Sequence, residues 1–267
     1  MTSEDRDPTA VAEPDEPVSR SSSAQEQTTK TKTKKKHLPV WQETILLLGI
    51  ALVLAVVIKA LFIQAFYIPS QSMEPGLVKN DRILVQKVSY WFGDGPERGD
   101  VVVFKDPGGW LNAAESAGPT SGVAKLLSRV GLYPSGGHLV KRVIGTEGDV
   151  IVCCDKRGRV EVNGVPLNED DYARPDGNGC YGPMPEGGEC DWTVGPVPEG
   201  NVFVMGDNRN NSADSTVHLC EGRTECSDSP FVDADNVVGK VFVLLWPSSR
   251  FEFLDRPATF ADVPDPT

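Results

Sequence analysis

One long apolar stretch stands out in the distribution of hydrophobic and polar positions along the chain. Residues 45–58 hold no charged or strongly polar side chain, and the segment 41–66 around them has only Glu43 and Lys59 as charged residues. About 20 apolar helical residues cross a bilayer, and Trp41 and Phe66 mark the two margins, as aromatic residues do at membrane interfaces. The pattern predicts one transmembrane helix over residues 41–66.

Two other interpretations of this stretch are a buried core helix and a cleaved secretory signal. The second is disfavoured because the stretch begins 40 residues into the chain and no small-x-small site follows it directly. Five lysines between Lys30 and Lys36 precede the stretch, and no basic residue lies between Lys59 and Lys79. The positive-inside rule then predicts a cytoplasmic N-terminus, a single pass through the cell membrane and an extracytoplasmic domain over residues 67–267.

Before the span, residues 1–40 are rich in Ser, Thr, Pro and charge without apolar periodicity, which predicts a disordered cytoplasmic tail. After it, short runs rich in Val, Ile and Phe alternate with Gly, Pro and Asn, as in an antiparallel β protein. An Asn163-Gly164 turn between alternating apolar residues predicts a hairpin. Residues 123–132 suggest a short helix, and residues 168–198 a cysteine-bearing insertion. The fold class is therefore mainly β, with strands expected at 82–88, 100–104, 139–144, 149–154, 159–167, 201–205 and 237–246.

The formal net charge of −12 argues against nucleic acid as a partner, since phosphate binding needs a cationic surface. All six cysteines follow the span, in the compartment where disulfides persist, and none forms a C-x-x-C pair that would favour zinc. Cys180/Cys190 and Cys220/Cys226 are the easiest loops to close. Cys153 and Cys154 would point to opposite faces of a strand, so we expect two different partners for them. The full pairing stays open.

Three further segments carry possible chemistry: residues 68–77 (IPSQSMEPGL), 139–145 (LVKRVIG) and 204–215 (VMGDNRNNSADS). Singly, each is an ordinary turn or strand edge. Together, in this order and behind an N-terminal span, they resemble the bacterial type I signal peptidases, membrane-bound serine endopeptidases with a Ser/Lys dyad. The six-cysteine pattern and the basic N-terminal tail are similar to those of the actinobacterial members of the family.

The resemblance implies that Ser72 is the nucleophile and Lys141 the general base. It implies that Ser70 completes the oxyanion hole with the Ser72 backbone N–H. The supporting residues it implies are Ser212, Arg142, Asp207 and Asp214. Small substrate side chains would lie in shallow pockets lined by Phe66, Ile68, Pro69, Met73 and Val140. Two residues depart from the family pattern: Gly76, where Ala or Thr is frequent, and Thr216, where Arg is usual.

Residue chemistry independently favours these roles. A serine hydroxyl needs a base to become a nucleophile, and lysine can serve only when neutral, so its pKa must fall by about two to three pH units. In a strand Lys141 shares a face with the apolar Leu139 and Val143, whereas Arg142 points the other way and can pair with Asp207.

The expected function is a membrane-anchored serine endopeptidase that removes signal peptides from secreted preproteins beside membrane lipid. No metal or cofactor is expected, and the oligomeric state is left open. Three alternatives remain: a Ser/Lys peptidase with one surface-protein substrate, a non-catalytic disulfide-linked binding domain, and a triad using His138 as the base.

Overall fold

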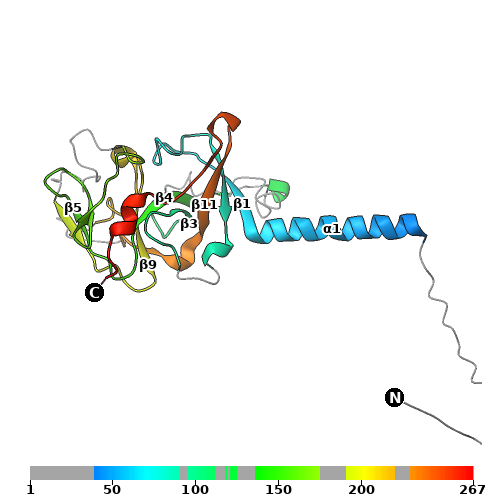
Figure 1. Cartoon of the computed structure of the whole chain (residues 1–267), viewed down its shortest axis with the longest axis horizontal. Coiled ribbons are helices and arrows are strands. Elements are labelled where there is room, and N and C mark those ends of the chain that lie inside the picture. Colours follow the sequence, from blue (N-terminus) through cyan, green and yellow to red (C-terminus); the bar gives the residue numbers. More distant parts are fainter. Residues whose placement is uncertain are drawn as a thin grey trace, which may run out of the picture. The chain divides into compact units, whose positions relative to one another are not determined.

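The computed structural model describes residues 39–90, 95–111, 118, 121–124, 136–174, 191–219 and 229–266. By its internal packing the chain divides into two units, residues 1–46 and 47–267, and the second contains every strand (Figure 1). The architecture of this unit is mainly β and antiparallel, which confirms the fold class predicted from the sequence.

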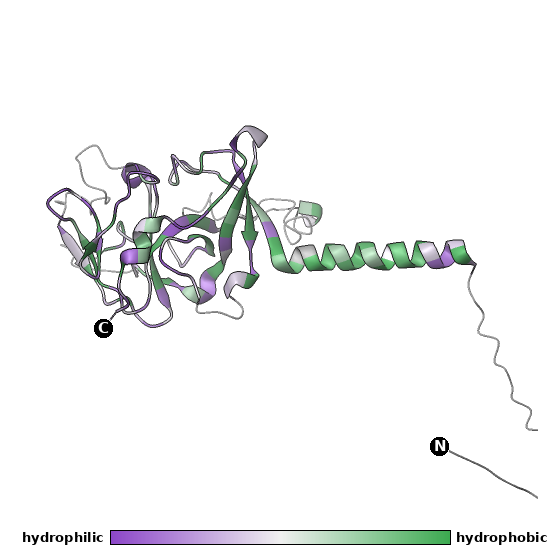
Figure 2. Cartoon of the chain, in the orientation of Figure 1, coloured by the Kyte–Doolittle hydropathy of each residue, from purple (hydrophilic) through white to green (hydrophobic). Residues whose placement is uncertain are grey.

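Helix α1 (Val40–Phe62) coincides with the apolar stretch. Its residues Val40–Ile58 have a mean hydropathy of 2.2, and none of that window is buried (Figure 2). Among the described residues, α1 is the one helix that is both long enough and apolar enough to cross a membrane. The helix ends four residues before the predicted boundary. Residues 63–67 instead form strand β1, because their backbone groups pair with a neighbouring strand from Ile63 to Tyr67.

The larger sheet has eight strands, in the order β1-β2-β11-β3-β4-β9-β10, with β12 pairing β11. Every pairing in it is antiparallel. The central position of β4 gives it a hydrogen-bonded neighbour on both sides, β3 and β9. The strands are β1 (Ile63–Tyr67), β2 (Arg82–Gln86), β3 (Val101–Lys105), β4 (His138–Gly145), β9 (Asn201–Met205), β10 (Val232–Asp233), β11 (Val237–Trp246) and β12 (Glu252–Phe253).

The smaller sheet has four strands in the order β7-β6-β5-β8. These are β5 (Ile151–Cys153), β6 (Glu161–Val162), β7 (Val165–Pro166) and β8 (Trp192–Val194). Asn163 and Gly164 join β6 to β7 with φ values of 52° and 78°, as a two-residue hairpin of type I′ requires. All seven strand regions expected from the sequence therefore contain strands, and the hairpin is confirmed.

Strand β8 lies within the region predicted as a cysteine-bearing insertion and pairs with β5, where the large Trp192 side chain is 1% exposed. One local expectation needs correction. Cys153 and Cys154 form a disulfide with each other rather than with two other partners. Strand β5 ends at Cys153, so the alternation of side chains between two faces does not extend to Cys154.

Several other sequence expectations fall partly or wholly outside the described residues. Cys180, Cys190, Cys220 and Cys226 are among them. Of the helix predicted over 123–132, residues 123 and 124 are described and are helical.

Three clusters of buried apolar side chains fill the β unit. One lies around the smaller sheet and includes Trp192 and Phe203. A second contains Ile68, Met73 and Leu77 from the segment after β1. The third includes Leu139 and Val143 of β4. The turn after β1 and the middle of β4 are therefore both held by packed core.

Candidate active site

The side chains of Ser72 and Lys141 meet in the interior although 69 residues separate them in sequence. Ser72 lies in the turn that follows β1, and Lys141 lies on β4 opposite Val102 of β3. Lys141 Nζ donates a hydrogen bond of 2.8 Å to Ser72 Oγ. Ser72 is 6% exposed and Lys141 4%. The predicted pair is thus in direct contact and largely removed from water.

The surroundings of Lys141 match the apolar face expected for it. Leu139 and Val143, two positions to either side on β4, are buried in the same core cluster as Val102. An amine that is buried among apolar side chains favours its neutral form, because burial penalises the charged one. The packing of β4 thus places Lys141 on a strand face lined by apolar side chains.

A second hydroxyl adjoins the pair. Ser70 Oγ lies 3.2 Å from Ser72 Oγ. The turn that carries both serines is fixed from the opposite side by Asn208, whose backbone N–H donates to Ser72 O at 2.9 Å and whose Nδ2 donates to Gln71 O at 3.1 Å. Asn208 was not predicted as a site residue, although it lies within the third sequence segment.

Gly206 packs directly between Ser72 and Ser212. A Cβ atom added to Gly206 would lie 2.5 Å from Ser72 O and 2.2 Å from Ser212 Oγ, where real contacts are not seen below 3.0 Å. Glycine is therefore required here for close backbone approach rather than for an unusual dihedral angle. The Gly-Asp-Asn sequence, an ordinary turn signal by itself, brings two backbone segments of the site together.

Asp214 accepts four hydrogen bonds in the interior. Its Oδ2 accepts from Gly206 N at 2.8 Å and from Ser212 Oγ at 2.6 Å. Its Oδ1 accepts from Thr216 N at 3.0 Å and from Thr216 Oγ1 at 2.7 Å. Thr216, which stands where the family usually has Arg, thus still supplies a donor to Asp214. The Ser212 hydroxyl donates to Asp214, and a contact of Ser212 with Lys141 stays a prediction.

Arg142 and Asp207 form a buried ion pair, as predicted. Arg142 Nε and Nη2 donate to the two carboxylate oxygens at 2.8 and 2.7 Å, and Nη1 donates to Gly99 O at 2.9 Å. The guanidinium lies 4.3 Å from the ring centre of Tyr172. Burial alone lowers the pKa of Arg142, but the Asp207 carboxylate outweighs it and holds this pKa above its ordinary value. Arg142 therefore remains charged and cannot act as a base.

The residues expected to line the substrate pockets gather around the second core cluster. Phe66, Ile68 and Met73 are buried in it, Val140 packs against it, and Pro69 is exposed. Leu77 and Ile83, which the sequence did not single out, belong to the same cluster. The structure thus brings four of the five predicted residues together.

The alternative base, His138, begins the same strand as Lys141. Its Nδ1 is 3.1 Å from Gly136 O, and its ring centre is 5.4 Å from that of Phe66. The hydrogen bond that Ser72 Oγ receives from a basic side chain comes from Lys141. Within the described residues, no group of three or more His, Cys, Asp or Glu side chains is arranged to hold a metal ion.

Comparison with known proteins identifies the family of this chain. A model of the family described as signal peptidase, peptidase S26, matches residues 41–246. A probable signal peptidase I of Mycobacterium leprae is 36% identical over 260 residues, which cover 89% of this chain and 86% of that protein. A signal peptidase I of Mycobacterium tuberculosis is 38% identical over 232 residues, which cover 79% of this chain and 74% of that protein.

Among solved structures, a signal peptidase I from Enterococcus faecalis is 23% identical, covers 55% of this chain and 97% of its own, and superposes with a TM-score of 0.28, too low to compare the folds. The match to the family model spans α1 and every strand through β11. The chain is a peptidase by class and belongs to the signal peptidase family, peptidase S26. The resemblance seen in the sequence is confirmed.

Proposed function

We propose that this chain is a membrane-anchored serine endopeptidase that removes signal peptides from secreted preproteins, with Ser72 as nucleophile and Lys141 as general base. The observation that carries the proposal is the 2.8 Å contact between Lys141 Nζ and Ser72 Oγ in a buried setting. Relatives named signal peptidase I support the choice of substrate.

In the proposed reaction the neutral Lys141 amine takes the proton of the Ser72 hydroxyl as Ser72 Oγ attacks the scissile carbonyl carbon. The developing oxyanion accepts hydrogen bonds from the Ser72 backbone N–H and from Ser70 Oγ. Lys141 then passes its proton to the leaving amine of the mature protein. Water hydrolyses the ester that joins the signal peptide to Ser72, again with Lys141 as base.

The proposed topology places the N-terminus in the cytoplasm and the β unit outside the membrane, as the lysines before α1 favour. A preprotein held in the bilayer by its own apolar segment would then be cut close to the outer surface. Protease added to intact cells should digest residues 67–267 and spare the N-terminal tail. The reverse protection pattern would contradict this topology.

The function is tested by cleavage of a preprotein with an Ala-x-Ala end, using the purified full-length chain in lipid vesicles. Ser72→Ala and Lys141→Ala are expected to lose nearly all activity. Ser70→Ala should lower kcat by about 100-fold, the typical effect of removing one oxyanion donor. His138→Ala, on the same strand as Lys141, is the matched control and should keep wild-type activity.

The other outcomes separate the alternatives. Activity that survives Lys141→Ala but not His138→Ala would indicate a histidine-based triad. A wild-type chain that binds preproteins without cutting them would indicate a binding domain. Cutting of one substrate from a panel of exported preproteins would indicate a narrow-substrate peptidase.

A further inference from the structure

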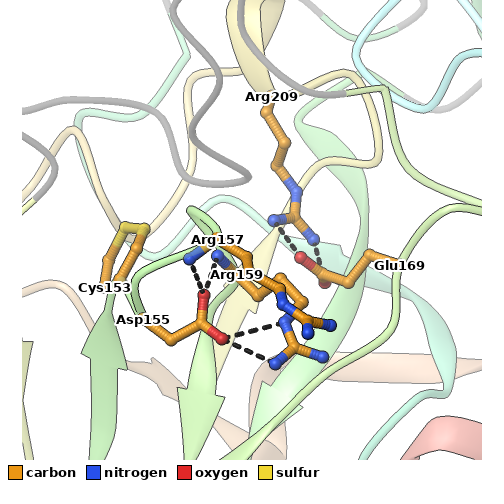
Figure 3. The surroundings of a disulfide bond; sticks show 7 residues. Cys153, Asp155, Arg157, Arg159, Glu169 and Arg209 are labelled. Atoms are coloured by element: carbon orange, nitrogen blue, oxygen red, sulfur yellow. Dashed lines mark hydrogen bonds and ion pairs between the residues drawn. A yellow bond between two sulfur atoms is a disulfide. The ribbon is translucent and has the colours of Figure 1, made fainter.

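A fully buried ion pair connects the beginning of the insertion to the turn that holds Ser72. Arg209 Nη1 and Nη2 donate to the two carboxylate oxygens of Glu169 at 2.9 and 2.6 Å, and both side chains are 0% exposed. Figure 3 shows the guanidinium of Arg209 directed at Glu169. Burial alone lowers the pKa of Arg209, but the Glu169 carboxylate holds it above its ordinary value, so Arg209 stays charged.

Arg209 also fixes the turn 206–209 internally. Its Nε donates to Gly206 O at 2.9 Å, and its backbone N–H donates to Arg174 O at 3.1 Å. The side chain of Arg209 therefore bridges from Glu169 to the backbone of Gly206. Without its carboxylate partner, the Arg209 guanidinium would be destabilised in this position and would tend to move toward solvent, because an unpaired buried charge raises the free energy of the folded state.

The turn held by Arg209 packs closely against the backbone of Ser72. Gly206 is packed against the carbonyl oxygen of Ser72 and the side chain of Ser212. The backbone N–H of Asn208, two residues after Gly206, donates to the same Ser72 carbonyl oxygen. A displacement of Gly206 or Asn208 must therefore move the backbone that presents the Ser72 hydroxyl to Lys141.

Residues 172–174 attach the same segment to the other side of the site. Tyr172 Oη donates to Glu169 Oε1 at 2.7 Å, while the Tyr172 ring lies against the Arg142 guanidinium. Burial and the Glu169 carboxylate raise the pKa of Tyr172 well above its ordinary value, so its hydroxyl keeps the proton that it donates. Arg174 N donates to Asp207 O at 2.7 Å, and isolated bridges join residue 173 to Pro75 and residue 174 to Asn208.

We propose that Glu169 is a positioning residue for the peptidase reaction. It holds Arg209, Arg209 holds the turn 206–209, and this turn holds Ser72 and Ser212 in the geometry that Lys141 requires. Glu169 acts through these residues and has no contact with the reacting atoms. The inference rests on the proposed function in one respect, the role of Ser72 as nucleophile.

The test compares Glu169→Gln with a matched variant at a second buried carboxylate, Asp149→Asn. Asp149 is 0% exposed and accepts two hydrogen bonds of 2.7 Å from Arg98. Its loss also removes a carboxylate from a guanidinium, which keeps a longer contact of 3.7 Å with Asp265. Both variants should lower the melting temperature of the full-length chain in vesicles. Only Glu169→Gln should lower kcat for preprotein cleavage, by about 10- to 100-fold, with KM within about twofold of wild type, because misplacement near 1 Å costs about 100-fold.

A double variant, Glu169→Met with Arg209→Met, removes the ion pair without leaving an unpaired buried charge. It therefore separates the loss of positioning from the cost of an unpaired charge, and it replaces Glu169→Gln in the test if that variant does not fold. Apolar side chains of similar volume can replace a buried ion pair without loss of stability. We expect its melting temperature to lie above that of Glu169→Gln, because no unpaired charge is buried, but below that of wild type, because Tyr172 Oη and Gly206 O lose their partners. Its kcat should still be low, because Gly206 O has lost the Arg209 donor. A wild-type kcat in either variant, or equal kcat losses in Glu169→Gln and Asp149→Asn, overturns the positioning role.

Ser72→Ala is measured in the same series to keep the two proposals apart. If Ser72→Ala cleaves the preprotein as wild type does, the proposed nucleophile is wrong and the inference about Glu169 falls with it. If Ser72→Ala is inactive while Glu169→Gln keeps wild-type kcat, the proposed function stands and only the positioning role is refuted.

Discussion

Replacing Gly206 with alanine should disable the site while leaving the fold in place. The added Cβ would lie 2.2 Å from Ser212 Oγ and 2.5 Å from Ser72 O, against a shortest real contact of 3.0 Å. Relief of the two overlaps requires shifts of at least about 0.8 Å and 0.5 Å respectively. The backbone angles of Gly206 are not in the left-handed region, so the whole effect is steric.

The shifts translate into both a stability and a rate effect. Overpacking typically costs about 1–3 kcal/mol, of which the lower backbone entropy of unfolded alanine offsets about 0.4–1 kcal/mol. The net destabilisation should be about 1–2 kcal/mol, which a domain of this size survives. Because the Ser72 backbone moves by a sizeable part of 1 Å, kcat/KM should fall by about 10- to 100-fold.

Gly76→Ala is the control on the same turn as Ser72. Its added Cβ would meet Met73 O at 3.8 Å and Asp207 Oδ2 at 3.9 Å, both ordinary contacts. This variant should keep wild-type activity and be equally stable or slightly more stable. Preprotein cleavage and thermal unfolding in vesicles measure both variants. Equal activity of Gly206→Ala and Gly76→Ala would refute the steric reasoning.

Two further predictions concern a buried and a partly buried carboxylate. Thr216→Val removes a hydroxyl donor from Asp214 and should lower the stability by about 1–3 kcal/mol and also lower kcat/KM. Thr216→Ser, which keeps the hydroxyl, should retain wild-type stability and kcat/KM. Unchanged stability and kcat/KM in Thr216→Val would contradict the role of this hydrogen bond. Desolvation opposes the charge of Asp155, but hydrogen bonds from Arg159 lower its pKa to about 2, from 3.8. The resulting stability is present above the unfolded pKa and is lost as pH falls through the folded one. Unfolding midpoints of wild type and Asp155→Asn should therefore converge as pH drops from about 4 toward 2, and a constant difference would argue against the pair.

The strands that carry the site were predictable because their sequences are long and strongly patterned. Strand β4 has eight residues with apolar positions on both sides of Lys141, so its existence and the opposite directions of Lys141 and Arg142 follow from side-chain alternation. Charge favoured an acidic partner for Arg142, and the family resemblance selected Asp207 as that partner. Direct contact of Ser72 with Lys141, in contrast, was expected only from the family resemblance.

Other elements lack a distinctive local pattern. Ile63–Tyr67 follows the helix without a break and has no charged residue, so only its pairing with β2 shows that it is a strand. Trp192–Val194 is three residues long in a region rich in Gly and Pro. Periodicity cannot identify a segment as short as this, because two or three residues fit every template.

The polar network around the site was the least predictable part. Glu169 is one of 38 acidic residues, and its partner Arg209 lies 40 positions away. A buried carboxylate has the same sequence signature as an exposed one, and only the tertiary fold distinguishes them. The disulfide of Cys153 with Cys154 was mispredicted for a related reason, since the strand end that permits it is not visible in the sequence.

The adjacency of Lys141 and Arg142 on β4 has a consequence for folding errors. A strand that pairs one residue out of register turns every side chain to the opposite face. In such a misfolded copy the guanidinium of Arg142 would face Ser72, and arginine keeps its proton at any physiological pH. In the proposed reaction Ser72 would then have no base to accept its proton. The misfolded enzyme would be inactive and would not cleave the proteins around it.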